Sequence, residues 1–364
     1  FKNYKYDDKK FDKNINIIRI PSFSRGKGDS ISLFLNFFSF ILSGIFFSHF
    51  KLRGKRYDYI LTFATSPVTV SLISIYINFF KNSKLVLWLL DYWPDIIFEL
   101  KYVKSSFNKY ILTKVVNFIY KKQNCILAQS KSYLNKIQKS QNNNTKQKLI
   151  YFPSWPESIR KKNDVKINRI FKKDPKETKI VFTGNIGEAQ GFEKVVELCK
   201  KFKKLKFRVF VIGTGRWLDK IRGTIKKEKI NNIKFFGHKS VDKIYPFFKN
   251  ADVLLVTLKE GKVFDSTIPG KFSTYLNFNK PILGLIGGET KNLINKNSLG
   301  FAVQNFKIKN NNKKLISFFK NINKKKIDNQ SFVKKYFLKE TILEKLHSYF
   351  YENKIKLKFI SKAK

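Results

Sequence analysis

A glycine-rich segment, Lys179–Gly191, carries the clearest chemical signal in the sequence. It reads KIVFTGNIGEAQG: an apolar run enters Gly184 and Gly187, and a helix is predicted to begin near Gly191. Glycines let backbone amides approach an anion, and a helix N-terminus adds partial positive charge, so the segment fits a phosphate site. A tight strand-to-helix turn also needs glycine, and the residues alone leave both roles open. The segment matches neither a Walker loop nor the GxGxxG dinucleotide fingerprint.

A carboxylate in the first half of the chain is the second candidate. Asp91 follows the apolar run Lys84–Leu90, which predicts a buried strand. An acid at the carboxyl end of a parallel strand faces the ligand crevice, where it could orient a hydroxyl group or take its proton. It could equally cap the following turn, with Trp93 and Pro94 as packing.

Metal and thiol chemistry are not indicated. Cys125 and Cys199 lie inside apolar runs, and His49, His238 and His347 are isolated from one another. Buried cysteines of this kind act as small apolar side chains, and scattered histidines form no metal cluster. We therefore predict no metal, no cofactor and no disulfide, which fits a reducing, cytosolic compartment.

The net charge points to an anionic surface as a partner. The chain has 74 Lys and Arg against 26 Asp and Glu, which gives +48 at pH 7, and its lysines are scattered rather than gathered in one patch. Such a field favours phospholipid or nucleic acid. Because no helix-turn-helix, zinc-finger, KH or RRM signature is present, we predict a membrane surface and no nucleic acid.

Short apolar runs alternate with amphipathic segments along the chain, as in α/β proteins with parallel sheets. Strands are predicted at Ile15–Ile20, Asp58–Phe63, Lys84–Leu90, Cys125–Gln129, Lys179–Thr183, Phe207–Ile212, Ile233–Phe236, Asp252–Thr257 and Pro281–Leu285. Phe192–Lys204 is one of the helices between them. The pattern predicts a first domain at 1–150, a linker at 151–175 and a second domain at 176–330. A single helix at 331–350 is expected to return to the first domain.

Segment Ile31–Phe50 carries no Asp, Glu, Lys or Arg and is long enough to cross a bilayer. Its polar residues follow helical spacing and form one stripe, and basic residues flank it on both sides. The stripe comprises Ser32, Asn36, Ser39 and Ser43. A helix that docks on the membrane explains both features best; a buried helix and a true span are the alternatives.

Four blocks of the second half occur in the order found in family 4 glycosyltransferases. They are Gly184–Gly191, Val211–Gly215, Ile233–His238, and Thr267–Lys271 with Tyr275 and Lys280–Ile282 after it. In the first half, Asp91-Tyr-Trp-Pro-Asp95 is similar to the Asp-x-Trp-Pro-Glu/Asp signature of the branch that builds bacterial O-antigens and capsules, including the fucosamine transferases. The resemblance covers roughly Arg56 to Phe350.

The resemblance implies a GT-B fold: α/β, with two Rossmann-like domains whose parallel sheets face each other across a cleft. It implies donor binding by Gly184, Asn185, Gly187, Gln190, Gly213, Arg216, His238, Asp265, Thr267, Pro269, Lys271 and Thr274. Asp91 stays the candidate catalytic residue, as the group that orients the acceptor hydroxyl or takes its proton. It also implies that this chain lacks the family's first strand and helix. Since the sequence contains no Met, we expect it to begin inside a longer reading frame.

Two departures from the family pattern affect the donor site. The basic pair that grips the diphosphate in many members is absent, and the first loop offers only Asn185 and Gln190. Lys271, with Arg216 or Lys194, must then neutralise the diphosphate. The family's paired glutamates are also missing: Asp265 is the nearest acid, and Thr274 takes the second position, which leaves the ribose contact open.

By resemblance the protein is a retaining, metal-independent glycosyltransferase. The implied donor is a nucleotide sugar, UDP-linked, and the implied acceptor is a polyprenyl-diphosphate-linked glycan of surface polysaccharide biosynthesis. We expect a cytoplasmic protein held peripherally on the inner face of the cell membrane. Two alternatives stay open: a GT-B-fold UDP-sugar epimerase, and a non-catalytic subunit that binds a nucleotide sugar.

Overall fold

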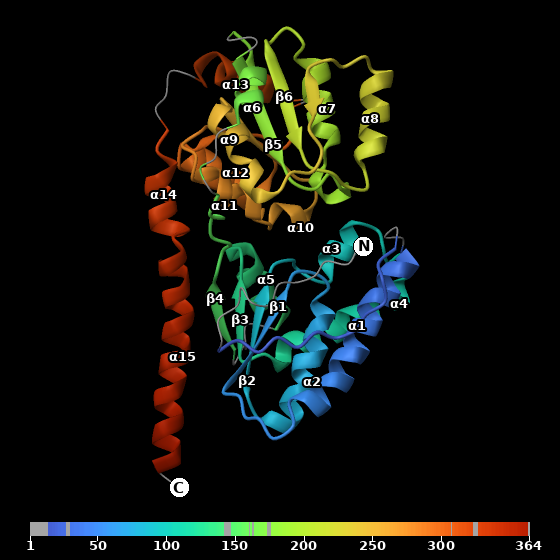
Figure 1. Cartoon of the computed structure of the whole chain (residues 1–364), viewed down its shortest axis with the longest axis vertical. Helices are drawn as coiled ribbons and strands as arrows, with labels where there is room; N and C mark the ends of the chain where they lie inside the picture. The colour runs from blue at the N-terminus through green and yellow to red at the C-terminus, as the bar shows by residue number, and fades with distance from the viewer. Residues whose placement is uncertain are drawn as a thin grey trace.

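Strands and helices alternate along the chain and build two parallel sheets, which lie one above the other along the molecule's long axis (Figure 1). The computed structural model describes residues 14–26, 30–141, 147–159, 161, 164–172, 176–306, 308–322 and 327–362. Two α/β layers in succession are what the alternating pattern predicts, so the α/β fold class is confirmed.

The first domain has a four-stranded sheet in the order β1-β2-β3-β4, with every neighbouring pair parallel. Its strands are β1 (Tyr59–Ala64), β2 (Lys84–Leu89), β3 (Cys125–Ala128) and β4 (Lys148–Tyr151). Its helices are α1 (Ser30–Lys51), α2 (Ser71–Lys81), α3 (Asp95–Glu99), α4 (Ser106–Lys122) and α5 (Lys131–Ser140), with a 3-10 turn, η2, at Val68–Val70. All four residues of β3 are buried, as expected for an inner strand covered on both faces.

The second domain has a six-stranded sheet in the order β10-β9-β8-β5-β6-β7, again with parallel neighbours. Its strands are β5 (Thr178–Thr183), β6 (Phe207–Ile212), β7 (Ile233–Phe235), β8 (Val253–Thr257), β9 (Ile282–Leu285) and β10 (Gly300–Ala302). Its helices are α6 (Val165–Lys172), α7 (Glu193–Lys201), α8 (Leu218–Lys227), α9 (Tyr245–Asn250), α10 (Lys262–Asp265), α11 (Gly270–Leu276), α12 (Gly288–Lys296) and α13 (Lys309–Asn321), with 3-10 turns η3 (Glu188–Gln190) and η4 (Val241–Lys243).

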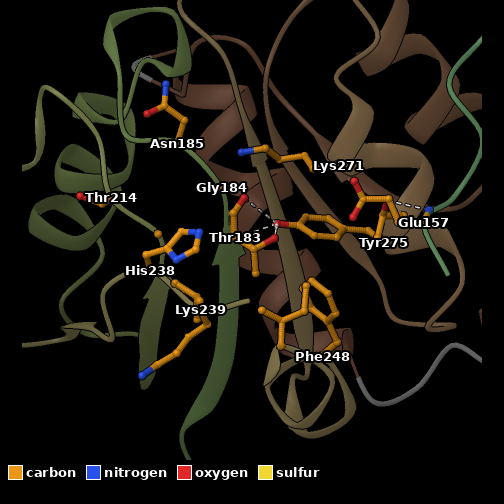
Figure 2. A pocket seen from close by; sticks show the side chains of 14 residues that line it. Glu157, Thr183, Gly184, Asn185, Thr214, His238, Lys239, Phe248, Lys271 and Tyr275 are labelled. Atoms are coloured by element: carbon orange, nitrogen blue, oxygen red, sulfur yellow. Dashed lines mark hydrogen bonds between the residues drawn. The ribbon is translucent and has the colours of Figure 1, made fainter. Parts of the chain in front are cut away.

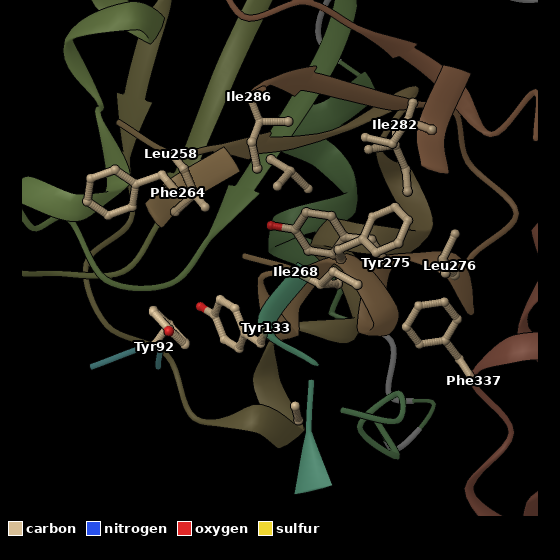
Figure 3. Packing of buried hydrophobic residues seen from close by; sticks show 14 of the residues in the cluster. Tyr92, Tyr133, Leu258, Phe264, Ile268, Tyr275, Leu276, Ile282, Ile286 and Phe337 are labelled. Atoms are coloured by element: carbon tan, nitrogen blue, oxygen red, sulfur yellow. The ribbon is translucent and has the colours of Figure 1, made fainter. Parts of the chain in front are cut away.

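One buried apolar cluster crosses the boundary between the domains (Figure 3). It joins Tyr92 and Tyr133 of the first domain to Phe264, Ile268 and Ile286 of the second. Burial of aromatic and aliphatic side chains is the main source of cohesion in such clusters. The two domains are therefore joined by apolar packing.

Polar contacts reinforce this boundary. The hydroxyl groups of Tyr133 and Thr267 lie 2.8 Å apart in a buried position. The backbone N–H groups of Lys131 and Ser132 donate to the Glu289 carboxylate at 3.0 and 2.9 Å. An acid of the second domain thus satisfies the first amides of α5, which have no partner inside that helix.

The C-terminal segment contains two helices where one was predicted at 331–350. They are α14 (Asn329–Tyr336) and α15 (Lys339–Lys362), and the break lies at buried Phe337, whose ring is 5.9 Å from that of Phe272. The prediction of one helix was wrong because each half buries its face on a different domain. α14 packs on α11, while Ile342 and Tyr349 of α15 join the first domain's core.

The predicted strand at Ile15–Ile20 is also wrong. These residues form no strand, and most of their side chains are exposed or half-buried. A run of isoleucines becomes a strand only where a neighbour completes its hydrogen bonds, and no described strand pairs with it. Conversely, β4 and β10 were not predicted, because both runs are short.

The interval predicted as linker contains a helix. Phe171 of α6 stacks on Phe210 of β6 with ring centroids 4.3 Å apart, so α6 packs on the second domain. We propose that the connection between the domains is the shorter stretch 152–164.

Helix α1 is long and apolar enough to cross a membrane by length and composition, and 6% of its apolar window is buried. One side of it lies against α2, where the absence of a side chain at Gly44 admits Ile73. Its polar stripe contacts the preceding segment: Ser39 Oγ accepts from the Phe23 N–H at 2.8 Å, and Asn36 Oδ1 accepts from Arg25 Nε at 2.9 Å.

Candidate functional site

A cavity of ≈ 370 Å³ opens at the carboxyl ends of β5, β6 and β7 (Figure 2). Its wall comprises Glu157, Thr183, Gly184, Asn185, Ile212, Gly213, Thr214, His238, Lys239, Ile244, Phe248, Lys271, Thr274 and Tyr275. The carboxyl edge of a parallel sheet is where α/β proteins bind ligands. The volume lies in the range of small-molecule pockets.

The cavity's floor depends on glycine at two adjoining turns. Gly184 ends β5 with φ +123° and Gly213 ends β6 with φ +152°, conformations that L side chains rarely adopt. A Cβ at Gly213 would lie 1.9 Å from the Gly184 carbonyl oxygen. At Gly215, a Cβ would lie 2.4 Å from Asn185 Oδ1. The two turns are therefore in backbone contact.

Most amide groups of the first turn already have acceptors within the protein. The Gly184 N–H donates to the Ile212 carbonyl and the Ile186 N–H to the Thr214 carbonyl, both at 2.9 Å. The Gly187 N–H donates to Gln190 Oε1 at 3.0 Å. The turn thus has fewer backbone N–H groups available to a ligand than a phosphate-binding loop has. An anionic ligand at this turn would need a positive side chain as well.

Lys271 supplies that charge. Its Nζ is buried, has no hydrogen-bond partner among the described residues, and lies 3.8 Å from the centroid of the Phe182 ring. A Cβ at Gly184 would be 3.1 Å from this nitrogen, so glycine there admits the ammonium group. Burial lowers the pKa of Lys271 to about 7. An ammonium group without a counter-ion at the floor of a cavity is arranged for an anionic ligand.

The helix that carries Lys271 is held against β5. The Thr183 N–H donates to the Tyr275 hydroxyl at 2.8 Å, and burial raises the pKa of Tyr275 to about 12. Tyr275 therefore stays a neutral hydrogen-bonding group. This bond fixes the position of α11, and with it Lys271 and Thr274, along the cavity wall.

Six of the predicted donor residues line the cavity, and six do not. Those in its wall are Gly184, Asn185, Gly213, His238, Lys271 and Thr274. Gly187 and Gln190 are bonded to each other within the turn, where Gln190 Oε1 also accepts from Asn185 Nδ2 at 3.4 Å. Pro269 precedes α11 as its N-terminal flanking residue.

The other predicted donor residues contact different parts of the molecule. Arg216 donates from Nη2 to the Tyr102 hydroxyl of the first domain at 2.9 Å. Asp265 accepts from Gln304 Nε2 at 3.0 Å, and Thr267 is bonded to Tyr133. Lys194, the alternative cation, forms an ion pair with Glu260 at 3.5 Å. Of the cations considered for the diphosphate, Lys271 is the one that reaches the cavity.

Asp91 lies two residues after Leu89, the last residue of β2, on the first domain. Burial raises the pKa of Asp91 to about 6. It is flanked by buried Tyr92 and Trp93, and the Trp93 carbonyl accepts from the Tyr120 hydroxyl at 2.9 Å. A proton acceptor with a pKa just below neutrality suits general-base chemistry.

Several residues of the cavity were not predicted. Lys239, Ile244 and Phe248 follow a predicted strand, but their helix and turn gave no chemical signal. Glu157 belongs to the stretch predicted as linker, and its N–H donates to Thr274 Oγ1 at 3.3 Å. The sequence of a connecting segment has no pattern that shows which of its residues line a pocket.

Residues 164–330 match the family described as glycosyl transferases group 1. Two curated relatives are similar to the chain. The putative colanic acid biosynthesis glycosyl transferase WcaI of Escherichia coli (strain K12) is 29% identical over 35% of this chain and 32% of its own length. The probable glycosyltransferase WbjE of Pseudomonas aeruginosa is 23% identical over 68% of this chain and 63% of its own. The chain thus aligns with less than two thirds of either relative.

Solved structures share the fold. The crystal structure of Anabaena Alr3699/HepE in complex with UDP has a TM-score of 0.63 and 13% identity, covering 87% of this chain and 84% of that one. At this identity the likeness establishes the fold, which is the GT-B arrangement of glycosyltransferases, as predicted.

Proposed function

We propose that this chain, whose second domain belongs to the glycosyl transferases group 1, transfers a sugar from a UDP-linked donor to a lipid-linked acceptor in bacterial surface polysaccharide biosynthesis. The observation that carries the proposal is the buried Lys271 Nζ, which has no hydrogen-bond partner in the described part of the chain and lies beside two glycine turns at the carboxyl edge of the sheet. The names of the curated relatives support the pathway class, and the complex of HepE with UDP supports the donor class.

In this proposal Lys271 stabilises the leaving diphosphate. Negative charge builds up on the diphosphate as the bond to the sugar breaks, and a fixed cation in a dry site stabilises that charge strongly. The diphosphate in turn raises the pKa of Lys271, because an opposite charge favours the ammonium form. We propose that no metal is required and that the anomeric configuration is retained.

Asp91 is proposed to act on the acceptor. It lies on the domain opposite the nucleotide cavity, so its carboxylate can orient the acceptor hydroxyl group and take up its proton. A base whose pKa is about 6 is largely ionised at pH 7 and remains so through the physiological range.

Helix α1 is proposed to place the first domain on the membrane. Its exposed residues Phe46 and Phe50 are 59% and 60% accessible. Their rings form a row of contacts with His49 and with Phe80 of α2, and neighbouring ring centroids in this row are 5.1 to 5.6 Å apart. Lys51, Arg53, Lys55 and Arg56 follow directly. Apolar side chains beside basic ones match the interface of an anionic bilayer, where each Lys or Arg adds about 1 kcal/mol.

Mass spectrometry of a lipid-linked acceptor, after incubation with the protein and a panel of nucleotide sugars, tests this function. We expect one UDP-sugar to add one sugar mass to the acceptor. Conversion of the donor sugar without acceptor would indicate an epimerase instead. Binding of UDP with no turnover across the panel would indicate a non-catalytic subunit. Either outcome contradicts the proposal.

A further inference from the structure

Glu157 brings a carboxylate from the connecting segment to the nucleotide cavity of the second domain. Its backbone N–H donates to Thr274 Oγ1 at 3.3 Å, which ties the segment to α11. Figure 2 shows the carboxylate turned toward the space beside Lys271 and Tyr275. Glu157 is the one acid among the residues that line this cavity.

The residues before Glu157 are anchored on the first domain. Phe152 is fully buried in that domain's core, and Trp155 packs with its ring 5.4 Å from that of Trp88 in β2. Pro153 and Pro156 restrict the backbone on either side of Trp155. The position of Glu157 is therefore set by the first domain, although its carboxylate lies in the cavity of the second.

The chemistry of a carboxylate restricts which part of a nucleotide it can contact. An ionised carboxylate only accepts hydrogen bonds, and it repels phosphate. Uridine diphosphate offers few donors: the two ribose hydroxyl groups and the N–H of the base. If Glu157 contacts the ligand, it must accept a hydrogen bond from one of these groups.

The geometry of α11 favours the ribose as the group that Glu157 contacts. Lys271 and Thr274 are three residues apart, so they lie on one face of the helix about 4.5 Å apart along its axis. A diphosphate at Lys271 places the attached ribose about one such step away, beside Thr274 and Glu157. We propose that Glu157 accepts hydrogen bonds from the ribose hydroxyl groups of the bound nucleotide. This assignment rests on the proposed nucleotide-sugar function.

A consequence follows for the relation between the domains. The diphosphate contacts the second domain, while the ribose contacts a segment anchored on the first. Bound nucleotide therefore holds the connecting segment against α11, and Glu157 acts as a positioning residue that links donor binding to the placement of the acceptor domain.

Calorimetric titration of the full chain with UDP, 2′-deoxy-UDP and 3′-deoxy-UDP tests the assignment. Hydrogen bonds to a charged group contribute about 1.5–3 kcal/mol, so Glu157→Gln is expected to weaken UDP binding about 10- to 100-fold. The loss of affinity caused by Glu157→Gln should be smaller for a deoxynucleotide, because that ligand lacks a hydroxyl group that would donate to Glu157. Glu344→Gln, which neutralises an exposed acid on α15, should bind all three ligands as the unmodified chain does.

Three outcomes would overturn the assignment. Equal UDP affinity of the Glu157→Gln and unmodified chains would contradict the assignment of Glu157 to the ribose but not the proposed function. An equal loss for UDP and both deoxynucleotides would show that Glu157 acts elsewhere on the ligand. Absence of UDP binding by the unmodified chain would overturn both the assignment and the proposed function. Thermal denaturation of each variant shows whether it is folded.

Discussion

Each domain holds an ionisable group that burial shifts toward its neutral form, but the surroundings of the two groups differ. Lys271 lies beside two backbone turns, where Gly184 and Gly213 meet. Asp91 follows a single strand and precedes the buried residues Tyr92 and Trp93 in sequence. Burial shifts both groups toward their neutral forms, with a pKa of about 7 for Lys271 and about 6 for Asp91.

The difference in surroundings fits the ligand that each domain is proposed to bind, the donor at Lys271 and the acceptor at Asp91. A diphosphate is common to all UDP-linked sugar donors, and a floor of glycine turns suits one fixed ligand but tolerates no added Cβ. Acceptors differ in shape, and a face built from side chains can change without altering the backbone. We therefore expect single substitutions to be most damaging on the donor face.

Substitution of Gly213 should have the largest effect. A Cβ there meets the Gly184 carbonyl oxygen at 1.9 Å in a backbone conformation that disfavours L residues, so Gly213→Val should abolish UDP binding in calorimetry. Gly223→Ala is the matched control, because nothing lies within 4 Å of a Cβ at that position of α8. It should bind UDP normally and stabilise the fold by about 0.5–1 kcal/mol. Equal UDP affinity of the Gly213→Val and Gly223→Ala variants would show that the turn is not part of the donor site.

Removal of the Lys271 charge should have the next largest effect. Lys271→Met should lower the rate of sugar transfer about 10²- to 10³-fold and weaken UDP binding less, since the charge acts mainly as the diphosphate departs. The ligand-free variant should be more stable at pH 7, because a buried ammonium group is gone. The pKa in the folded state is depressed, so unmodified protein should gain stability relative to the variant as pH rises from 7 toward 10. Unchanged turnover would rule out this role for Lys271.

The Asp91→Asn variant should lose activity and gain stability. The raised pKa of Asp91 means that the folded state binds more protons than the unfolded state between about pH 4 and 6. Stability is therefore lost as pH rises through this window, by up to about 3 kcal/mol. At pH 8 the variant should melt higher than the unmodified chain, and transfer by the unmodified chain should fall below about pH 6. A variant that keeps its transfer rate would leave Asp91 with a structural role only.

The smallest effect is expected at the membrane face of the first domain. Flotation with anionic liposomes should retain the chain at low salt and release a substantial share at high salt. Phe46→Ser combined with Phe50→Ser should lower the bound fraction several-fold, whereas Tyr351→Ser, at a similarly exposed aromatic on α15, should not. Retention that resists both salt and alkaline carbonate would show that α1 spans the bilayer.

The sequence predicted most strands of both sheets, including the edge strands β1 and β7. It failed where pairing or packing with distant segments decides the structure. Ile15–Ile20 pairs with none of the described strands, and the pattern at 331–350 does not reveal that α14 and α15 bury their faces on different domains.

The residues that line the cavity divide in the same way. Gly184, Gly213 and Lys271 could be placed at one site from the sequence, because local backbone geometry and charge mark them. Asp265, Thr267 and Arg216 were expected at the donor but bond to Gln304, Tyr133 and Tyr102 instead. Glu157 could not be predicted, since only the path of the connecting segment in space brings it to the cavity.

The central claim is that Lys271 meets a nucleotide diphosphate, and proton uptake on binding tests it most directly. At pH 8 a lysine whose pKa is about 7 is largely neutral, and a bound diphosphate should restore its proton. UDP titrated into the full chain at pH 8, in two buffers of different ionisation enthalpy, should bind with uptake of nearly one proton. Lys271→Met should bind with almost none. UDP binding without proton uptake by the unmodified chain, or with equal uptake by both proteins, would contradict the account.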